Sequence, residues 1–270
     1  MLVDFRGKER FRPFYRLLVR FGIDPLKPIR LGKSLLDCYH DYITLKHQEA
    51  FAKQQFKFAK WRLFLADKFT ESGVASGHYF HQDLLVARRV YQNAPTIHLD
   101  IGSRIDGFVA HVASFREIVV MDIRPLSYHL PNVKFVQVNL TLNLEPQWID
   151  YCDSLSCLHT LEHFGLGRYG DSVDYDGYLV GLNNLYRILR QGGKLYLSVP
   201  IGSQRIEFNA HRVFSMRYLL DLFDGKFQID FFSYVDDAGA LHEHSALTKD
   251  AVANNLGCNY GCGIFEMTKI

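Results

Sequence analysis

The stretch TIHLDIGSRIDGFVAHVASFREIVVMD, residues 96–122, decides the fold. We expect an apolar strand at 97–101, a glycine-containing turn, a short helix, and a second apolar strand that ends in an acid. In a parallel α/β sheet, such a unit places backbone amides and a carboxylate around a nucleotide-like ligand at the carboxyl ends of the strands. Asp100 and Asp122 end the two strands, and Gly102 and Gly107 let the backbone come close to the ligand.

Strands and helices alternate from residue 96 to the C-terminus. Short apolar runs predict seven strands, at 97–101, 118–121, 133–138, 155–158, 195–199, 227–234 and 263–267. Helical patterns lie between several of them, notably at 178–190 and 215–223. Runs of Val, Ile and Leu without strict alternation are typical of strands covered on both faces. We therefore predict an α/β fold for residues 96–270, a doubly wound and mostly parallel seven-stranded sheet.

Residues 1–95 differ in character and predict a helical N-terminal extension. Helical spacing without Gly or Pro predicts a long helix at 34–69, which Ser34 would cap. A second helix is expected at 82–93, and Pro95 ends it. Tyr79, His81 and Asp83 lie just before the first strand, where we expect them to close over the ligand as a lid.

Composition limits the classes of function. A net charge of +2 gives no reason to expect nucleic acid as a partner, and no apolar run approaches the ~20 residues that cross a bilayer. The first 23 residues lack the uninterrupted apolar core of a signal peptide, so we expect a cytoplasmic protein. Five scattered cysteines predict free, buried thiols rather than disulfides or a metal site, although Cys258 and Cys262 form a C-x3-C pair.

The glycine turn fits a dinucleotide only in part. Gly102 and Gly107 take the first and third glycine positions of G-x-G-x-x-G, and Asp122 lies about twenty residues further on, as an acid that binds ribose should. The middle glycine position, however, is Arg104. A pyrophosphate needs a bare backbone there to approach the helix N-terminus, so Arg104 disfavours this ligand.

S-adenosylmethionine, which has no phosphate, fits the same residues better. Asp100 suits the ammonium group of its methionine end, Asp122 suits the ribose hydroxyls, and Asn139 follows the third strand where it can reach the adenine edge. The alternative is that these three residues only cap loops and helices, but they stand at successive strand ends beside the glycines.

The motif order DIGS…G, VVMD, FVQVNL, DSLSCLHTLEHF and LYRILRQGGKLYLSVP resembles that of class I S-adenosylmethionine-dependent methyltransferases. The longer motifs HYFHQDLLVA, DIRPL, SCLHTLEHFGLGRYGD and RIEFNAHRVF resemble an uncharacterised bacterial and nematode family, a domain of unknown function. The resemblance implies the fold and the cofactor, and a role in the synthesis of surface polysaccharide. By position, it implies that the methionine and sulfonium end contacts Asp100, Gly102, Ser103 and Gly107, and that the ribose and adenine contact Asp122, Ile123, Asn139 and Leu140.

A histidine-rich segment follows the fourth predicted strand. His159, Glu162 and His163 match the H-x-x-E-H pattern of a metalloprotease class, but Gly165 and Gly167 would end the helix that this pattern needs. In methyltransferases of class I, a segment of this kind borders the active site. An oxygen nucleophile benefits from a base that titrates near neutral pH. We expect His159 to be that base, with His163 and Glu162 as alternatives.

Two residues after the fifth strand, His211 and Arg212, are candidates to face the substrate. The sequence thus predicts an S-adenosylmethionine-dependent methyltransferase that acts on oxygen in a small or glycan-linked acceptor. One alternative is an NAD(P)-dependent oxidoreductase on a similar sheet. Another is a catalytically silent methyltransferase fold that serves as a binding module in glycan assembly.

Overall fold

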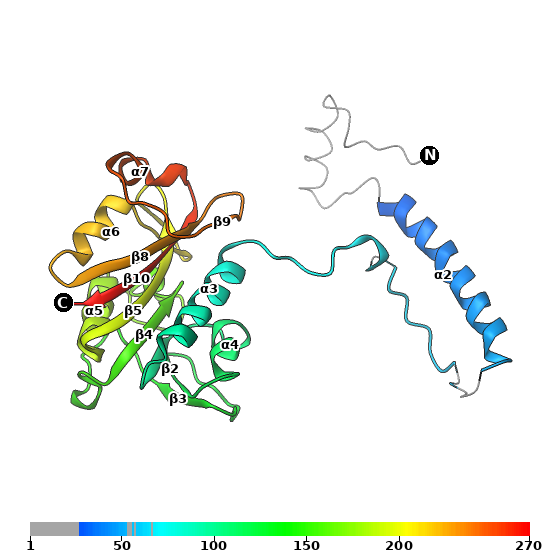
Figure 1. The fold of residues 1–270 in the computed structure, drawn as a ribbon, viewed down its shortest axis with the longest axis horizontal. Helices are drawn as coiled ribbons and strands as arrows, with labels where there is room; N and C mark the ends of the chain where they lie inside the picture. The colour runs from blue at the N-terminus through cyan, green and yellow to red at the C-terminus, as the bar shows by residue number, and fades with distance from the viewer. Residues whose placement is uncertain (1–26, 53–55, 57, 66) are drawn as a thin grey trace. The chain divides into compact units, whose positions relative to one another are not determined.

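The computed structural model describes residues 27–52, 56, 58–65 and 67–270 (Figure 1). The chain divides into two compact units, Met1–Val74 and Ala75–Ile270. The expectation about the first 23 residues falls outside the described part of the chain.

The larger unit is built on one eight-stranded sheet. Its order is β3 (Val133–Gln137), β2 (Ile118–Asp122), β1 (His98–Ile101), β4 (Cys152–Leu158), β5 (Leu189–Ile201), β10 (Gly261–Lys269), β8 (Phe227–Val235) and β9 (Leu241–His242). The first five strands in this order pair in parallel, whereas β10 is antiparallel to both β5 and β8. All seven predicted strands are present, and the two-residue β9 adds an eighth at the edge. The predicted α/β fold is confirmed.

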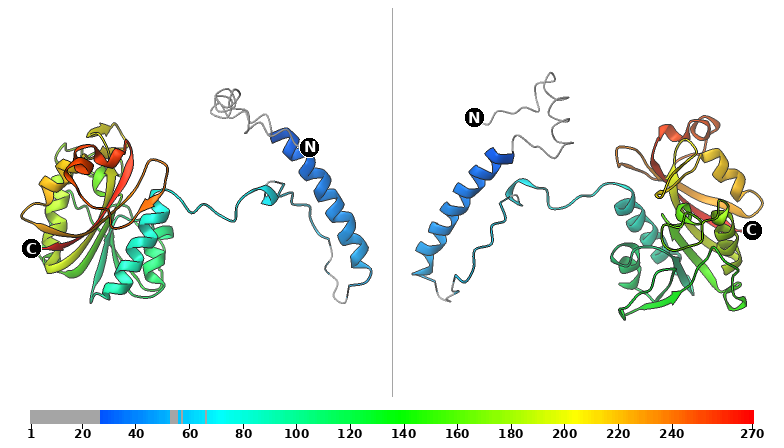
Figure 2. Two further views of the ribbon diagram at one scale, coloured as in Figure 1. Left: turned by 45° about the horizontal axis from the view of Figure 1, so that its top comes forward. Right: turned by 180° about the vertical axis from the view of Figure 1, so that it is seen from behind.

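Helices cover both faces of the sheet (Figures 1 and 2). On one face lie α3 (His78–Asn93) and α4 (Ala110–Ala113), and on the other lie α5 (Gly177–Ile188) and α6 (Met216–Phe223). Each pair packs its apolar residues on the sheet in a separate core cluster. The strands are buried on both faces as a result, which explains their lack of alternation. The remaining elements are α7 (Lys249–Ala253), the β6–β7 hairpin (Arg205–Glu207 and His211–Val213) and several single turns.

Helix α3 belongs to the sheet unit rather than to the N-terminal extension. Val86 and Val90 are buried in the cluster that also contains residues of the sheet. Arg89 donates two hydrogen bonds to the carboxylate of Glu266 on β10, at 2.6 and 3.0 Å. The compact unit therefore begins at Ala75, earlier than the boundary at residues 95 and 96 suggested by the sequence.

In the N-terminal unit, the prediction of one helix over residues 34–69 is wrong. Helix α2 spans Lys27–Glu49, so Ser34 lies inside it and does not cap it. Residues 58–65 have no regular secondary structure, and a 3-10 turn, η2, follows at Asp67–Phe69. Phe51 and Phe58, which the prediction placed on the apolar stripe of this helix, lie beyond its end and are exposed. Among the described residues, no helix is both long and apolar enough to span a bilayer.

Candidate functional site

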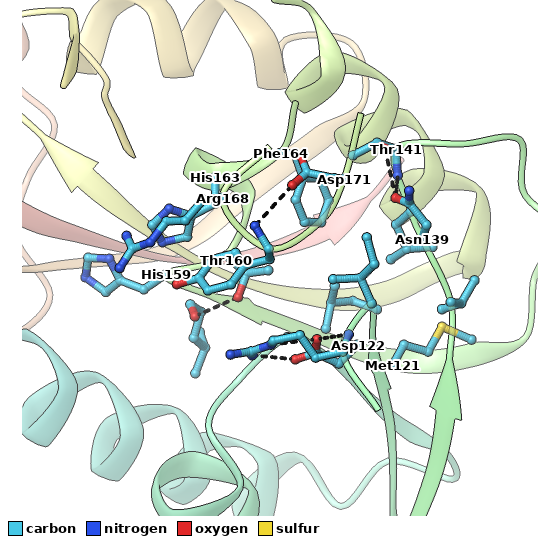
Figure 3. A pocket seen from close by; sticks show the side chains of 18 of the residues that line it. Met121, Asp122, Asn139, Thr141, His159, Thr160, His163, Phe164, Arg168 and Asp171 are labelled. Carbon is cyan, nitrogen blue, oxygen red and sulfur yellow. Dashed lines mark hydrogen bonds and ion pairs between the residues drawn. The ribbon is translucent and has the colours of Figure 1, made fainter. Parts of the chain in front are cut away.

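A cavity of about 350 Å³ opens at the carboxyl ends of β1 to β4 (Figure 3). Its volume lies at the lower end of the range for ligand sites. Five of the residues predicted to bind the cofactor line it: Gly102, Asp122, Ile123, Asn139 and Leu140. Two predicted catalytic residues, His159 and His163, also line it. The chain thus brings together residues from four consecutive strand ends, which is the arrangement that the sequence predicted.

Asp100 lies beneath the glycine turn and not in the cavity. Its side chain has no exposed surface. It accepts hydrogen bonds from the backbone N–H and hydroxyl of Ser103, at 3.0 and 2.8 Å, and from the hydroxyl of Ser156 at 2.5 Å. Burial raises the pKa of Asp100 to about 7, although these hydrogen bonds act in the opposite direction. Asp100 and Ser103 therefore hold the turn in shape, and neither of them lines the cavity.

Both turn glycines make close approaches. Gly102 has φ of 71°, and a Cβ placed there would lie 2.5 Å from Cγ2 of Thr160. A Cβ on Gly107 would lie 2.6 Å from Oδ2 of Asp83, the buried carboxylate on α3. Gly107 thus allows the turn, which includes a π-helical segment at Ile105–Val109, to pack closely against α3. Gly107 does not line the cavity. Burial raises the pKa of Asp83.

Replacing Gly102 with alanine should destabilise the protein by about 2–5 kcal/mol. The left-handed φ costs about 1–2 kcal/mol for a residue with a Cβ, and the overlap with Thr160 adds about 1–3 kcal/mol. Gly192→Ala is a matched control, because Gly192 has φ of 72° and open space around its Cβ position. Urea denaturation should show a smaller loss for Gly192→Ala. Equal losses for the two variants would mean that the contact with Thr160 costs nothing.

Arg104 lines the cavity at the glycine turn and pairs with Asp106. Its Nε and Nη2 lie 2.9 and 2.7 Å from the two carboxylate oxygens, and both side chains are exposed. Each partner favours the charged form of the other, so the pKa of Arg104 is raised and that of Asp106 is lowered. The turn therefore carries a neutralised ion pair, with the Arg104 side chain where a pyrophosphate needs a bare backbone.

Asp122 at the end of β2 is held by Arg124. Oδ1 accepts from the backbone N–H and Nε of Arg124, at 2.8 and 3.0 Å, and Oδ2 accepts from Nη2 at 2.6 Å. The guanidinium of Arg124 also lies over the ring of Tyr169, 4.7 Å from its centroid. Because a carboxylate has about four acceptor positions, Asp122 keeps one for a ligand hydroxyl.

Asn139 and Leu140 follow β3 on the adjoining wall. Oδ1 of Asn139 accepts from the backbone N–H and hydroxyl of Thr141, at 2.9 and 2.8 Å, which fixes the orientation of the amide. Asn184 of α5 donates to the carbonyls of Leu140 and Leu142, at 2.9 and 2.8 Å. These hydrogen bonds therefore fix the conformation of the loop that lines the cavity before any ligand binds.

His159 adopts the left-handed region, with φ of 49°, directly after β4. Its Nδ1 lies 2.7 Å from Oε1 of Glu162, and its side chain is almost fully buried. Burial alone lowers the pKa of His159, but Cys262 and Glu162 raise it well above the usual value. Glu162 itself is buried and does not line the cavity, so it positions His159 rather than touching a ligand.

His163 ends a single 3-10 turn, Leu161–His163. Its Nδ1 donates to the backbone carbonyl of Ala210 at 2.7 Å, so in the neutral ring Nε2 carries the free lone pair. Nε2 lies 3.8 Å from Oε1 of Glu162. Burial lowers the pKa of His163, which favours the neutral form. Because neither histidine lies on a sustained helix, the metalloprotease arrangement is absent.

The structure does not bring His211 into the cavity. Its Nε2 lies 3.3 Å from Oε2 of Glu207 without hydrogen-bond alignment. Arg212 is buried and donates to the backbone carbonyls of Phe164 and Tyr175, at 2.6 and 2.9 Å. Its role is to hold the loop after β4 in place, so it is not available for a substrate anion.

Sequence reasoning missed several polar or aromatic cavity residues, among them Arg124, Thr160, Arg168 and Tyr169. Arg124 belongs to the DIRPL motif, and the other three belong to the segment SCLHTLEHFGLGRYGD. Their place within these motifs was a signal that they lie near the site. Their contacts depend on the loop conformation, which no spacing in the sequence specifies.

The sheet order, with β10 antiparallel between β5 and β8, defines a methyltransferase-like Rossmann fold. The family described as "Caenorhabditis protein of unknown function, DUF268" matches residues 128–256, just under half of the chain. Two of the longer motifs, SCLHTLEHFGLGRYGD and RIEFNAHRVF, lie within the matched residues. The sequence has no match among curated proteins.

Three solved structures illustrate the similarity of the fold. The [4+2]-cyclase SpnF is 15% identical with a TM-score of 0.48, and the match covers 70% of this chain and 80% of that one. The N-methyltransferase NodS from Bradyrhizobium japonicum, bound to S-adenosylhomocysteine, is 10% identical with a TM-score of 0.46, covering 77% and 91%. The 1,6-didemethyltoxoflavin-N1-methyltransferase of Burkholderia thailandensis is 14% identical with a TM-score of 0.47, covering 90% and 88%.

Proposed function

We propose that this protein binds S-adenosylmethionine and transfers its methyl group to an oxygen atom of a small or glycan-linked acceptor. The observation that carries the proposal is the order of Gly102, Asp122 and Asn139 along one cavity, at the ends of three adjacent strands. In this arrangement, the turn would receive the methionine end, Asp122 the ribose, and Asn139 with Ile123 and Leu140 the adenine.

The ion pair of Arg104 and Asp106 favours this cofactor over a dinucleotide. A pyrophosphate would meet the side chain of Arg104, which lines the cavity where a bare backbone is needed, and Asp106 already neutralises the charge of this side chain. S-adenosylmethionine carries no phosphate and makes no such demand. The NAD(P)-dependent oxidoreductase is therefore the weaker alternative.

Methyl transfer needs a nucleophile held in line with the sulfonium carbon, and the cofactor supplies the leaving group when bound. His163 is the base that the contacts support best. Its Nδ1–H is fixed on the Ala210 carbonyl, its Nε2 is free to take a proton, and Glu162 lies close enough to stabilise the resulting cation. We expected His159 in this role. Although burial acts to lower the pKa of His159, Cys262 and Glu162 raise it well above the usual value, which favours the charged form that cannot take a proton.

Isothermal titration calorimetry with the purified full chain tests the cofactor. Saturable binding is expected for S-adenosylmethionine and S-adenosylhomocysteine, and no binding is expected for NAD or NADP. The reverse pattern would establish the oxidoreductase alternative, and no binding by any of them would refute the proposal.

Turnover separates an enzyme from a silent binding module. Cofactor labelled on its methyl group should pass label to at least one member of an acceptor panel of phenols, sugar hydroxyls and carboxylates. Binding without transfer across the panel would favour the binding module in glycan assembly.

A further inference from the structure

A second group of reactive side chains adjoins the cavity, on elements far apart in the sequence. His78 begins α3, His159 follows β4, and Cys262 lies near the start of β10. One possible metal-ligand atom from each residue lies within 4.8 Å of the others. Among the described residues, this is the group of histidine, cysteine and acidic side chains that is close enough to hold an ion.

We propose that His78, His159 and Cys262 form a zinc site. Imidazole nitrogen and thiolate sulfur are the ligands that zinc prefers, at about 2.1 and 2.3 Å, and three protein ligands leave one position for water or another small ligand. The ligand atoms around a tetrahedral ion lie roughly 3.5 Å from one another. Side-chain rotations that move the three ligand atoms by about 1 Å would therefore complete the site.

The unpartnered nitrogen of His159 is an independent observation that points to a ligand. Its Nε2 is buried and has no hydrogen-bond partner, and only 4% of its side chain is exposed. A buried polar atom without a partner is costly, and an ion would satisfy it. The other ring nitrogen, Nδ1, is bound to Glu162 at 2.7 Å. A carboxylate in this position fixes the ring of a metal-binding histidine and directs its free nitrogen to the metal.

The two other residues are suited to the same ion. The Cys262 side chain is fully buried, and its sulfur lies 3.8 Å from Oε1 of Gln82, 4.0 Å from the carbonyl of Gly263 and within 4.8 Å of a ring nitrogen of each histidine. The ring of His78 is parallel to that of His159 within 7°, with centroids 5.2 Å apart. The sheet fixes the position of Cys262, because its register pairs this residue with Pro200 on β5 and Val235 on β8. In this position, its sulfur lies close to the two histidines.

The site would lie at the wall of the cavity, because His159 lines the cavity and the ring of Tyr79, another lining residue, lies 5.2 Å from it. Zinc at this wall is a Lewis acid that lowers the pKa of a bound water or hydroxyl group. Metal binding itself does not depend on the proposed methyl transfer, so the two can fail separately.

The experiment measures metal and not activity. The full chain, stripped with a chelator, is titrated with Zn²⁺ and with Co²⁺, and bound metal is quantified by mass spectrometry. We expect one ion per chain and, with Co²⁺, the charge-transfer absorption of a cobalt–thiolate bond. No saturable binding, or binding without the thiolate band, would overturn the proposal.

Matched variants assign the ligands. Cys262→Ser should abolish the thiolate band, and Glu162→Gln should weaken Zn²⁺ binding by about 10- to 100-fold while keeping the band. Cys258→Ser is the control, since Cys258 is a buried thiol on the preceding turn outside the cluster, and it should change neither readout. Circular dichroism and the midpoint of urea denaturation show whether each variant is folded. A band that persists in folded Cys262→Ser and disappears in Cys258→Ser would refute the assignment.

Discussion

Replacing His163 with glutamine should lower the rate constant of methyl transfer by about 10²- to 10⁴-fold, the usual contribution of a general base. The affinity for S-adenosylhomocysteine should stay within about twofold, because the imidazole is expected to act on the acceptor. Glutamine is similar in size to histidine, but its amide nitrogen takes the place of Nε2 rather than of Nδ1, which now contacts the carbonyl of Ala210 at 2.7 Å. Circular dichroism should therefore accompany the rate measurement and show an unchanged fold. The measurement uses methyl-labelled cofactor and the acceptor that the wild-type protein methylates.

His111→Gln is the matched control, since His111 is an exposed histidine on α4 that does not line the cavity. It should leave the rate unchanged. Imidazole added to His163→Ala should restore part of the lost rate, which a purely structural role would not allow. Full activity in His163→Gln would exclude His163 as the base.

The pH dependence gives a second readout for His163. Burial lowers its pKa below 6.5, an effect that Arg168 and His159 add to and that Glu162 and the Ala210 carbonyl oppose. A base acts in its neutral form, so the rate should be constant above pH 6.5 and fall as the pH drops through the lowered pKa. This acidic limb should be lost in His163→Gln. A limb centred above 6.5 would point to another group.

The sheet was predictable because burial on both faces leaves a direct trace in the sequence. Each strand is a short apolar run, and each turn before or after it carries Gly, Asp or Asn. The two-residue β9 has no such trace, because its pairing with β8 depends on the turn between them. The helix predicted over residues 34–69 extended too far because its spacing carries no stop signal: residues 50–69 contain neither Gly nor Pro, yet α2 ends at Glu49.

The sequence predicted those site residues whose place at the cavity depends only on their position at the end of a strand. Asp122 and Asn139 end adjacent strands, so their place at the cavity follows from the order of the sheet. How deeply each of these side chains is buried was not predictable from the sequence. Asp100 also ends a strand, yet the hydroxyls of Ser103 and Ser156 hold it below the turn. The proximity of Cys262 to His159 was not predictable either, because this proximity arises from the position of β10 beside β5 in the sheet.

Replacing Asp122 with alanine should weaken binding of S-adenosylhomocysteine by roughly 10- to 150-fold. Arg124 fills three of the acceptor positions of the carboxylate, which leaves one for a ribose hydroxyl. One hydrogen bond to a charged group contributes about 1.5–3 kcal/mol, which corresponds to this range of affinity. Calorimetry with the product avoids turnover during the measurement.

Asp106→Ala is an unusually close control for this change. Asp106 pairs with Arg104 two residues away through Nε and Nη2 at 2.9 and 2.7 Å, and Asp122 pairs with Arg124 through the same atoms at 3.0 and 2.6 Å. Asp106 does not line the cavity, whereas Asp122 does. Both variants free an arginine and remove one negative charge, so a general electrostatic effect would weaken binding equally in the two. Only a direct contact between Asp122 and the ribose makes the loss specific to Asp122→Ala, and equal affinities would remove that contact from the proposed site.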